Sequence, residues 1–462
     1  MNSGITPPEN KPASFPLMIE PPVTMTEAGQ PVLIHSGNFS LIKDGLTIPV
    51  NGRITFDWYP FTRISIEGKI KIKNKETYQS VENFGTHEVV INGHKFGDCS
   101  ISSVATDSEK SSIKIKGKLY ENNGLGDKSI KVDLIRFSIP NLSELWGSVV
   151  TKISKNTEFN FVSRVVFEND NHVITIDKQH NYSQLHESLL TKGGCVILYA
   201  GELKNKTGLI TYNEAKKNLE CFEKFLDLLN GRKISILFMT GYLNENKVWT
   251  DYSPHSVTSY NNVARWVCRH SNDGFNELYN EFLKLWDDDN DKNFLSFAMH
   301  WYVEANSNSG YTEGSIILSQ VALELIYNYL IIEKNNLLIG KDANGISAAN
   351  KIRLLLSHLQ IENKVPAKLT NLKQYIDSNP DITDAPEALT QIRNALVHSE
   401  LKKRSKINNI DFDVINDTLD LSLWYIEMSL LFILKYKGKH INRTSNYNLE
   451  KVPWVKEKVE NE

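Results

Sequence analysis

Polar and apolar residues alternate with a period of two over much of the first 150 residues. The clearest examples are residues 53–58, 63–72 and 112–119. This period is typical of strands with one buried face. Asn51-Gly52 and Asn123-Gly124 favour the tight turns of hairpins, so we expect such turns there. The pattern predicts an antiparallel β-rich domain over 23–150, folded as a sandwich or a barrel, after a flexible, proline-rich tail over 1–22.

Strand patterns and a helical pattern are interleaved in the next hundred residues. The first two of four predicted strands form a hairpin, and the four cover residues 161–167, 172–177, 195–199 and 234–239. Between the last two strands, apolar residues recur at helical spacing from 212 to 229, and Gly231 is expected to end this helix. We predict a mixed α/β domain over 151–255.

After about residue 270 the strand pattern stops and amphipathic helical patterns follow one another. The predicted helices cover 274–287, 291–305, 312–334, 347–360, 367–377, 384–401 and 410–436. They predict an all-α domain over 270–440, a bundle of four or five main helices, before a charged tail over 441–462. The expected fold class is therefore α+β and multidomain, with a β-rich N-terminal region, a mixed α/β middle region and a C-terminal helical bundle.

Length and composition agree with several globular domains. The chain has 462 residues, of which 40% are hydrophobic and 23% charged, and its formal net charge is −3. These values exclude a wholly disordered chain, a collagen-like repeat and a disulfide-rich mini-scaffold. Because the chain as a whole is not a polycation, any contact with nucleic acid must come from a local basic patch.

Cysteine usage and the absence of a leader pattern indicate a cytoplasmic protein. The four cysteines are widely scattered and form no C-x-x-C pair. The first residues lack the basic start and apolar core of a signal peptide. The apolar stretch 421–434 is too short to span a bilayer and contains Glu427. We therefore expect a reducing compartment and no membrane partner.

Common nucleotide, protease and hydrolase motifs are absent. The sequence has no G-x-G-x-x-G after a strand, no P-loop, no H-E-x-x-H and no G-x-S-x-G. The acidic run 287–291 lacks the glycine and the distal glutamate of an EF-hand, so we interpret it as a solvated loop between helices. We expect neither a metal nor a cofactor.

The segment 384–401 is the most informative for chemistry. Asp384 and Glu387 form a capping-box pattern, which predicts that a helix begins at residue 385. One face of this helix is apolar. The opposite face carries a polar row spaced i, i+4, i+7 and i+11, formed by Glu387, Gln391, Asn394 and His398. Arg393 flanks that row.

The sequence Arg393-Asn394-Ala-Leu-Val-His398 resembles the R-x4-6-H motif of the HEPN superfamily. Two other segments, 265–270 and 353–358, match R-x4-H as well. Only the 393–398 match has the asparagine, the capped helix and the apolar opposite face. The resemblance covers about 290–440, and the wider layout resembles prokaryotic proteins of the ApeA type.

The resemblance implies a metal-independent endoribonuclease that leaves a 2′,3′-cyclic phosphate, in anti-phage defence or toxin-like RNA cleavage. It implies that His398 transfers protons, that Arg393 holds the phosphate and that Asn394 orients either the phosphate or the histidine. Arg393 and His398 lie about 140° apart around one helix. That separation is awkward for a single site, and two such helices across a two-fold axis would bring two arginines and two histidines into one cleft. The resemblance implies dimerisation of this kind and RNA as substrate, so the expected partners are RNA and a second copy of the chain, in a homodimer with a shared active site.

Two features of this region allow more than one interpretation. Lys402, Lys403 and Arg404 either neutralise RNA phosphates or simply favour a helix C-terminus. The polar row is either a site or the solvated face of an amphipathic helix. The alternative to an enzyme is a non-catalytic RNA-, nucleotide- or ligand-binding protein whose helical domain dimerises, or a scaffold with an inactive site.

Residues outside this helix suggest fewer roles. We expect the N-terminal domains to sense a phage-derived or nucleic-acid trigger or to regulate activity. His300 and Trp301 are expected in the core, and Glu324 is expected to be partly exposed. The aromatic cluster at 58–61 lies among arginines and is either strand core or a platform for stacking bases.

Overall fold

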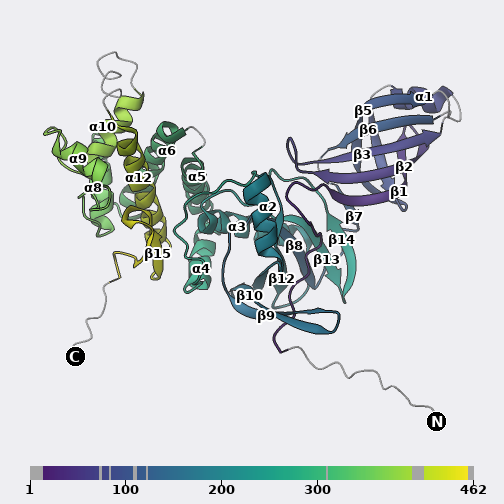
Figure 1. Ribbon diagram of the computed structural model, residues 1–462, viewed down its shortest axis with the longest axis horizontal. Helices are drawn as coiled ribbons and strands as arrows, with labels where there is room; N and C mark the ends of the chain where they lie inside the picture. The colour runs from purple at the N-terminus through teal and green to yellow at the C-terminus, as the bar shows by residue number, and fades with distance from the viewer. Residues whose placement is uncertain are drawn as a thin grey trace, which may run out of the picture. The chain divides into compact units, whose positions relative to one another are not determined.

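The computed structural model describes residues 14–71, 75–82, 85–107, 112–120, 123–308, 311–397 and 410–455. The chain divides into two compact units (Figure 1). The β unit comprises residues 1–215, 236–256 and 270–272. The helical unit comprises residues 216–235, 257–269 and 273–462. The α+β, multidomain fold class is confirmed, with β structure first and helices last.

Six strands of the β unit form a closed antiparallel barrel in the order β1-β2-β3-β6-β5-β4. Their bounds are β1 (Val32–Lys43), β2 (Leu46–Asp57), β3 (Arg63–Lys71), β4 (Thr86–Ile91), β5 (His94–Asp107) and β6 (Ser112–Leu119). The short helix α1 (Lys75–Glu82) lies between β3 and β4 in sequence. Burial alternates along β6, with isoleucines inside and lysines outside, as its period predicted. Of the two predicted folds for this region, a sandwich or a barrel, these six strands form the barrel.

The two predicted hairpin turns are both wrong. Asn51 and Gly52 lie inside β2, where Gly52 pairs with Gly68 of β3. A Cβ on Gly52 would lie 2.1 Å from the Glu67 carbonyl oxygen, so this glycine permits a close approach of strands rather than a turn. Gly124 begins β7 and pairs with Asp251, far away in sequence.

The second sheet of the β unit has eight antiparallel strands in the order β7-β14-β13-β8-β12-β11-β10-β9. Their bounds are β7 (Gly124–Gly126), β8 (Leu134–Pro140), β9 (Ser148–Ser154), β10 (Thr157–Glu168), β11 (His172–Lys178), β12 (Ile197–Asn205), β13 (Leu237–Leu243) and β14 (Asn246–Asp251). Two helices interrupt this series, α2 (Tyr182–Lys192) and α3 (Tyr212–Asn230). The predicted hairpin is formed by β10 and β11.

The predicted boundary at residue 150 does not separate two folded parts, because it falls inside β9, which belongs to the same sheet as β8. The start of the chain also differs from a free tail. Residues 16–18 run beside β9, with the Met18 amide donating to the Thr151 carbonyl at 2.9 Å. Ile19 is buried. Within the described residues, the predicted tail therefore packs on the sheet from residue 16 onward.

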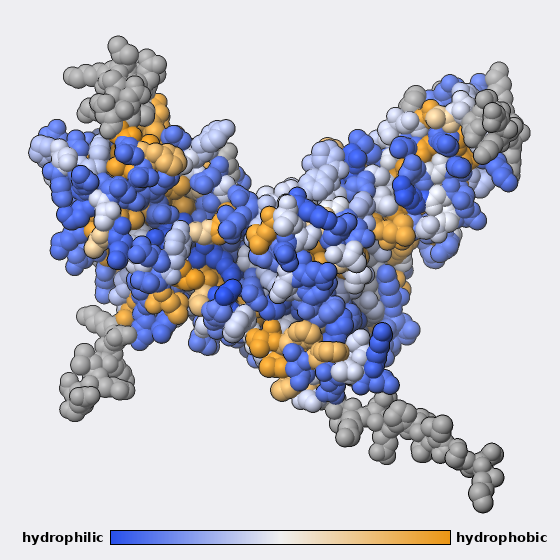
Figure 2. All heavy atoms as spheres, in the orientation of Figure 1, coloured by the Kyte–Doolittle hydropathy of each residue, from blue (hydrophilic) through white to orange (hydrophobic). Residues whose placement is uncertain are grey.

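The edge of this sheet also carries exposed apolar side chains. Figure 2 shows orange spheres gathered over β9 and β10. The large apolar residues of these strands that are exposed are Ile153, Phe159, Val162 and Val166.

The helical unit is built around one long buried helix, α12 (Phe412–Ile433), which contacts α5, α6, α9 and α10. The other helices are α4 (Phe275–Trp286), α5 (Asp289–Asn306), α6 (Tyr311–Tyr327), the π-helical segment η1 (Asn328–Lys334), α7 (Lys341–Asn344), α8 (Ala348–His358), α9 (Thr370–Asp377) and α10 (Ala385–Val397). Apolar stripes at helical spacing form the core, as their period predicted.

Most of α3 belongs to the helical unit and not to the sheet that surrounds it in sequence. Phe222 and Phe225 of α3 contact Tyr279 of α4, with ring centroids 5.7 and 5.1 Å apart. The Trp266 indole nitrogen donates to the Leu228 carbonyl at 3.0 Å. The predicted middle domain over 151–255 therefore contributes a segment to the helical unit.

The predicted charged tail over 441–462 is wrong for its first part. Residues 439–451 form the hairpin β15 (Lys439–Asn442), η2 (Arg443–Ser445) and β16 (Asn448–Lys451). Arg443 is only 5% exposed. Its burial needs a buried partner, which a local sequence pattern does not reveal.

One helical stretch of the described residues, Tyr311–Lys334, is long and apolar enough to cross a membrane by length and composition. Of its most apolar window, 61% is buried inside the protein. The core helix of a bundle passes the same test, so this stretch is weak evidence for a membrane span.

Candidate functional site

Helix α10 begins where the capping pattern predicted. The Asp384 carboxylate accepts a hydrogen bond from the Glu387 backbone amide at 3.0 Å, and the first helical residue is Ala385. Pro386 in the first turn is tolerated because its missing N–H would have no helical partner there. The apolar arc packs inward, and its buried members are Ala385, Ala388, Leu389, Ile392 and Ala395.

The start of α10 is joined to α8 by Arg353. Its Nε and Nη2 donate to the two carboxylate oxygens of Asp384 at 2.6 and 2.8 Å. Nη2 also contacts Glu387 at 3.1 Å. Arg353 belongs to one of the two R-x4-H matches outside 393–398, and its guanidinium holds a helix terminus. This geometry explains why that match needs no catalytic role.

The polar row of α10 lies on the opposite face from the apolar arc. Gln391 is half-buried, and its Nε2 donates to the Glu387 carboxylate at 3.3 Å. Asn394 is also half-buried. Glu387 is shared between Gln391 and Arg353, so the first turn of the row is structural. Asn394 is the first described member of the row that lies beyond this network.

Arg393 and Asn394 are in direct contact. The Arg393 Nη1 lies 3.2 Å from the Asn394 Oδ1. The Arg393 Nε is buried and has no hydrogen-bond partner among the described residues. A buried donor without an acceptor costs free energy, so an acceptor such as a phosphate oxygen that reached this nitrogen would gain a charge-assisted hydrogen bond.

A cavity of about 630 Å³ adjoins Asn394. Its walls come from α9, α10 and the N-terminus of α12, which lie side by side in Figure 1. Most of its polar lining consists of amide and carboxylate side chains, including Gln391, Asp381 and Asp411. The described lining contains no lysine or arginine. The cavity therefore suits a neutral hydrogen-bonding group better than an anion.

The walls of this cavity are fixed by caps and burial. The residue that precedes α9, Leu369, makes no side-chain capping hydrogen bond. Instead, the Asp417 carboxylate of α12 accepts hydrogen bonds from the backbone amides of Asn371 and Leu372, at 3.0 Å each. Tyr375 on α9 also lines the cavity, and burial raises the pKa of its phenol. Two of the three helices that bound the cavity, α9 and α12, are thus tied together at the start of α9.

The remaining predicted site residues, His398, Lys402, Lys403 and Arg404, lie outside the described residues. The structure therefore brings together Arg393 and Asn394, and it describes no position for the other four.

A buried ionic network in the helical unit was missed by the sequence analysis. Glu427 is fully buried in α12 and accepts from Arg443 Nη2 at 2.5 Å and from the Tyr302 hydroxyl at 2.8 Å. Arg443 also donates to the Asn306 Oδ1 at 3.0 Å. The sequence feature that could have indicated this network is a lone glutamate within an apolar helix, because a buried carboxylate requires a buried partner.

His440 lies near this network. The Trp424 indole nitrogen donates to the His440 Nε2 at 3.3 Å. Burial lowers the pKa of the imidazole. This histidine therefore packs as a neutral core residue against α12.

Other predicted residues have simple structural roles. The acidic run opens α5 instead of forming a loop, because Asp288 caps that helix and Asp291 pairs with Lys334 at 2.7 Å. His300 is exposed, so its expected core position is wrong, whereas Glu324 is partly exposed as predicted and lies 3.6 Å from Lys351.

The aromatic cluster of the barrel divides between the core and the surface. Trp58 is buried and donates to the Gln30 carbonyl at 2.8 Å. Phe61 is 61% exposed, and the Arg63 guanidinium carbon lies 5.7 Å from its ring centroid. Trp58 therefore has the strand-core role, and Phe61 remains available as a surface aromatic.

Comparison with known proteins gives matches over most of the chain. Residues 127–263 match the family model of the YopA central domain, and residues 288–457 match that of the YopA C-terminal domain. The "SPbeta prophage-derived uncharacterized protein YopA" of Bacillus subtilis (strain 168) is 25% identical over 441 residues, which cover 93% of this chain and 96% of that protein. No solved structure shows significant similarity. The chain is therefore similar to a prophage-derived protein over nearly its whole length. The match to the central-domain model includes β8 to β14, and the match to the C-terminal-domain model includes α5 to β16.

Proposed function

We propose that this protein is a metal-independent endoribonuclease of the HEPN type, acting in prokaryotic anti-phage defence or in toxin-like RNA cleavage. The observation that carries the proposal is the Arg393–Asn394 contact on a capped helix of the helical unit. Arg393 retains an unpaired buried donor among the described residues. His398 follows one helical turn later in the sequence.

The proposed reaction is an internal transesterification of RNA. The 2′-hydroxyl oxygen attacks the adjacent phosphorus, its proton passes to His398, and the bond from phosphorus to the 5′ oxygen breaks. The leaving 5′ oxygen takes up a proton, so the products are a 2′,3′-cyclic phosphate and a 5′-hydroxyl. A histidine suits both transfers because its ordinary pKa is near 6.5. Arg393 stabilises the extra negative charge of the transition state.

The proposed active unit is a homodimer, since two copies of α10 across a two-fold axis would place both arginines and both histidines in one cleft. Lys402, Lys403 and Arg404 would add positive charge for RNA beside it. The β unit would sense the trigger or regulate the site, and the protein would act in the cytoplasm.

Cleavage of total cellular RNA in EDTA tests the proposal. The wild-type protein should generate cyclic-phosphate ends, and His398→Ala and Arg393→Ala should each lower cleavage by at least a hundredfold, as expected for loss of a general acid–base or of an electrostatic stabiliser. His358→Ala is the matched control, because His358 ends the R-x4-H match whose arginine holds the start of α10. Undiminished cleavage by His398→Ala would refute the assignment.

Mixing the two inactive variants tests the shared site. If Arg393 and His398 act from different protomers, a mixture of His398→Ala and Arg393→Ala should regain cleavage that neither shows alone. A mixture that stays inactive, although the two variants exchange subunits, would contradict a site shared in this way.

The amide- and carboxylate-lined cavity favours one alternative, a non-catalytic protein that dimerises through its helical unit and binds RNA, a nucleotide or another ligand, with a neutral hydrogen-bonding group such as a base in this cavity. That alternative predicts that binding to RNA or nucleotides survives in every variant while no cleavage is seen with any of them.

A further inference from the structure

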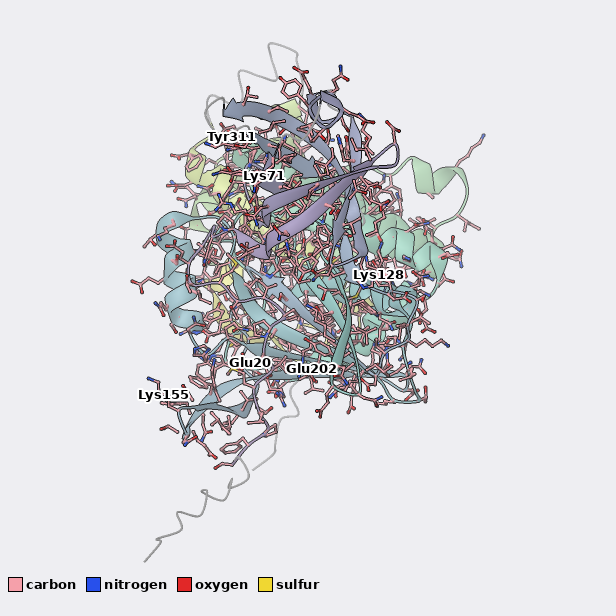
Figure 3. All side chains as sticks on the ribbon, turned by 90° about the vertical axis from the view of Figure 1, so that its right-hand side faces the viewer. Glu20, Lys71, Lys128, Lys155, Glu202 and Tyr311 are labelled. Carbon is pink, nitrogen blue, oxygen red and sulfur yellow. The ribbon has the colours of Figure 1, made fainter. Side chains whose placement is uncertain are left out.

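The outer surface of the barrel carries a row of lysines on two paired strands, which we name the lysine face. It consists of five exposed side chains, Lys69, Lys71, Lys114, Lys116 and Lys118. On β6 the lysines alternate with buried Ile113, Ile115 and Leu119, so all three point outward. Figure 3 labels Lys71 at the end of β3.

Barrel stability does not require this arrangement. Lys69 and Lys114 are directly opposite each other in the β3–β6 ladder, and like charges in such a position destabilise a sheet. On the other side of β6, the cross-strand partners of its three lysines are Ala105, Ser103 and Ser100, none of which is acidic. The lysines of β6 thus receive no compensating charge from β5.

One carboxylate lies within the lysine face, and it is already paired. Glu67 contacts Arg53 at 2.8 Å and Lys116 at 3.5 Å. Between residues 32 and 119 the chain has twelve lysines and arginines and nine aspartates and glutamates, although the whole chain carries a net charge of −3. Positive charge is therefore concentrated on the barrel and, within it, on β3 and β6.

The geometry suits an extended polyanion. Alternate residues of a strand are about 6.6 Å apart, which is comparable with the spacing of successive phosphates in an extended nucleic-acid strand. Exposed aromatic side chains flank one end of the lysine face. Tyr120, 53% exposed, continues the outward alternation of β6, and Phe61 lies beside Arg63 at the start of β3. Aromatic rings beside a basic track are typical of surfaces that bind single strands, whose bases are free to stack.

We propose that the lysine face is a docking surface for the phosphate backbone of single-stranded RNA. The choice of RNA rests on the proposed function. The lysines neutralise phosphates without reading the base sequence, and Tyr120 and Phe61 stack on unpaired bases at one end.

The test is binding of a fluorescein-labelled single-stranded RNA to full-length His398→Ala protein, measured by fluorescence anisotropy in EDTA over a range of salt concentrations. The substitutions Lys114→Gln, Lys116→Gln and Lys118→Gln are combined in one variant. Its affinity should fall at least tenfold at low salt. The slope of log affinity against log salt should become shallower by about 2, because each lysine–phosphate contact with a single strand contributes about 0.7.

A matched control carries Lys155→Gln, Lys216→Gln and Lys217→Gln, which remove the same charge from exposed positions of the β9–β10 turn and α3. Figure 3 labels Lys155 on that turn. The control should bind as the parent protein does. The unfolding temperatures of both variants should equal or exceed that of the parent, because no core residue is changed.

Three outcomes would overturn the proposal. The first is that the parent protein does not bind the RNA at low salt. The second is that the β6 variant keeps the affinity and the salt slope of the parent protein. The third is that the parent protein binds duplex DNA as tightly as single-stranded RNA at the same salt concentration. None of them depends on cleavage. RNA binding that requires the lysine face without any cleavage by the wild-type protein would instead refute the proposed nuclease and leave the docking surface standing.

Discussion

Asp227 is an acidic side chain that is almost wholly buried at the end of α3. Its carboxylate accepts from the Ile234 amide at 2.6 Å and from the Lys224 ammonium at 3.0 Å. Burial disfavours the charged form more than these two contacts favour it, so the pKa rises from 3.8 to about 6. The folded protein therefore binds this proton more tightly than the unfolded chain does.

The consequence is a specific pH dependence of stability. The contribution of Asp227 is full below about pH 4 and is lost as the pH rises through about 6. Asp227→Asn keeps an acceptor for Ile234 and removes the titration. The stability of the wild type relative to this variant should fall by about 2 kcal/mol between pH 4 and pH 7, measured by urea unfolding at each pH.

Glu220→Gln, on the exposed side of the same helix, is the matched control for that series. A wild type whose stability rises relative to Asp227→Asn over this pH range would contradict the raised pKa, because the sign of the linkage would be reversed.

At the scale of elements, the buried pair of Glu427 and Arg443 joins the hairpin β15–β16 to α12. Arg443 also reaches Asn306, whose side-chain amide donates to the Gly231 and Ala264 carbonyls at 2.7 and 2.8 Å. One arginine thus connects a late hairpin, two helices and the segment that follows α3. Removing Arg443 would leave the Glu427 carboxylate buried without a counter-ion, and removing Glu427 would leave Arg443 only the Asp420 carboxylate, 3.7 Å away.

We expect Glu427→Gln to destabilise the helical unit by about 3–5 kcal/mol, because buried Arg443 then keeps only the more distant Asp420, 3.7 Å away, as a counter-ion. The double variant Glu427→Gln with Arg443→Met should recover a large part of that loss. Urea unfolding followed by circular dichroism at 222 nm measures both. A double variant less stable than the single one would show that the hairpin is held by contacts of Arg443 other than the ion pair.

At the scale of the whole molecule, sequence order and structural units do not coincide. Residues 216–235 belong to the helical unit, while residues 236–256 return to the sheet of the β unit. A fragment that starts after residue 255 would therefore lack part of the helical core. Testing whether the β unit controls activity requires a fragment that retains residues 216–235.

We expect a fragment of residues 216–462, with 236–256 replaced by a glycine–serine linker, to unfold cooperatively. A fragment of residues 257–462 should be less stable by several kcal/mol, since Phe222 and Phe225 no longer cover Tyr279 and each buried aromatic contributes about 1.5–3 kcal/mol. Thermal unfolding by circular dichroism compares the two. Equal melting temperatures would contradict the assignment of α3 to the helical unit.

The sequence alone determined the features that arise from neighbouring residues. The period-two pattern predicted strands such as β6, helical spacing predicted α12, and Asp384 predicted where α10 begins. It also singled out Arg393 and Asn394, which the structure places in contact. These features are local because backbone geometry and capping depend on residues a few positions apart.

Tertiary structure alone decided what depends on distant residues. The order of the eight-stranded sheet, the close approach at Gly52, the pairing of Arg353 with Asp384 and the burial of Arg443 against Glu427 all join positions well separated in sequence. A glycine that favours a turn also permits close packing, and an isolated arginine shows no sign of its partner. Only the folded chain distinguishes these cases, because the free energy of each contact depends on what the rest of the fold brings beside it.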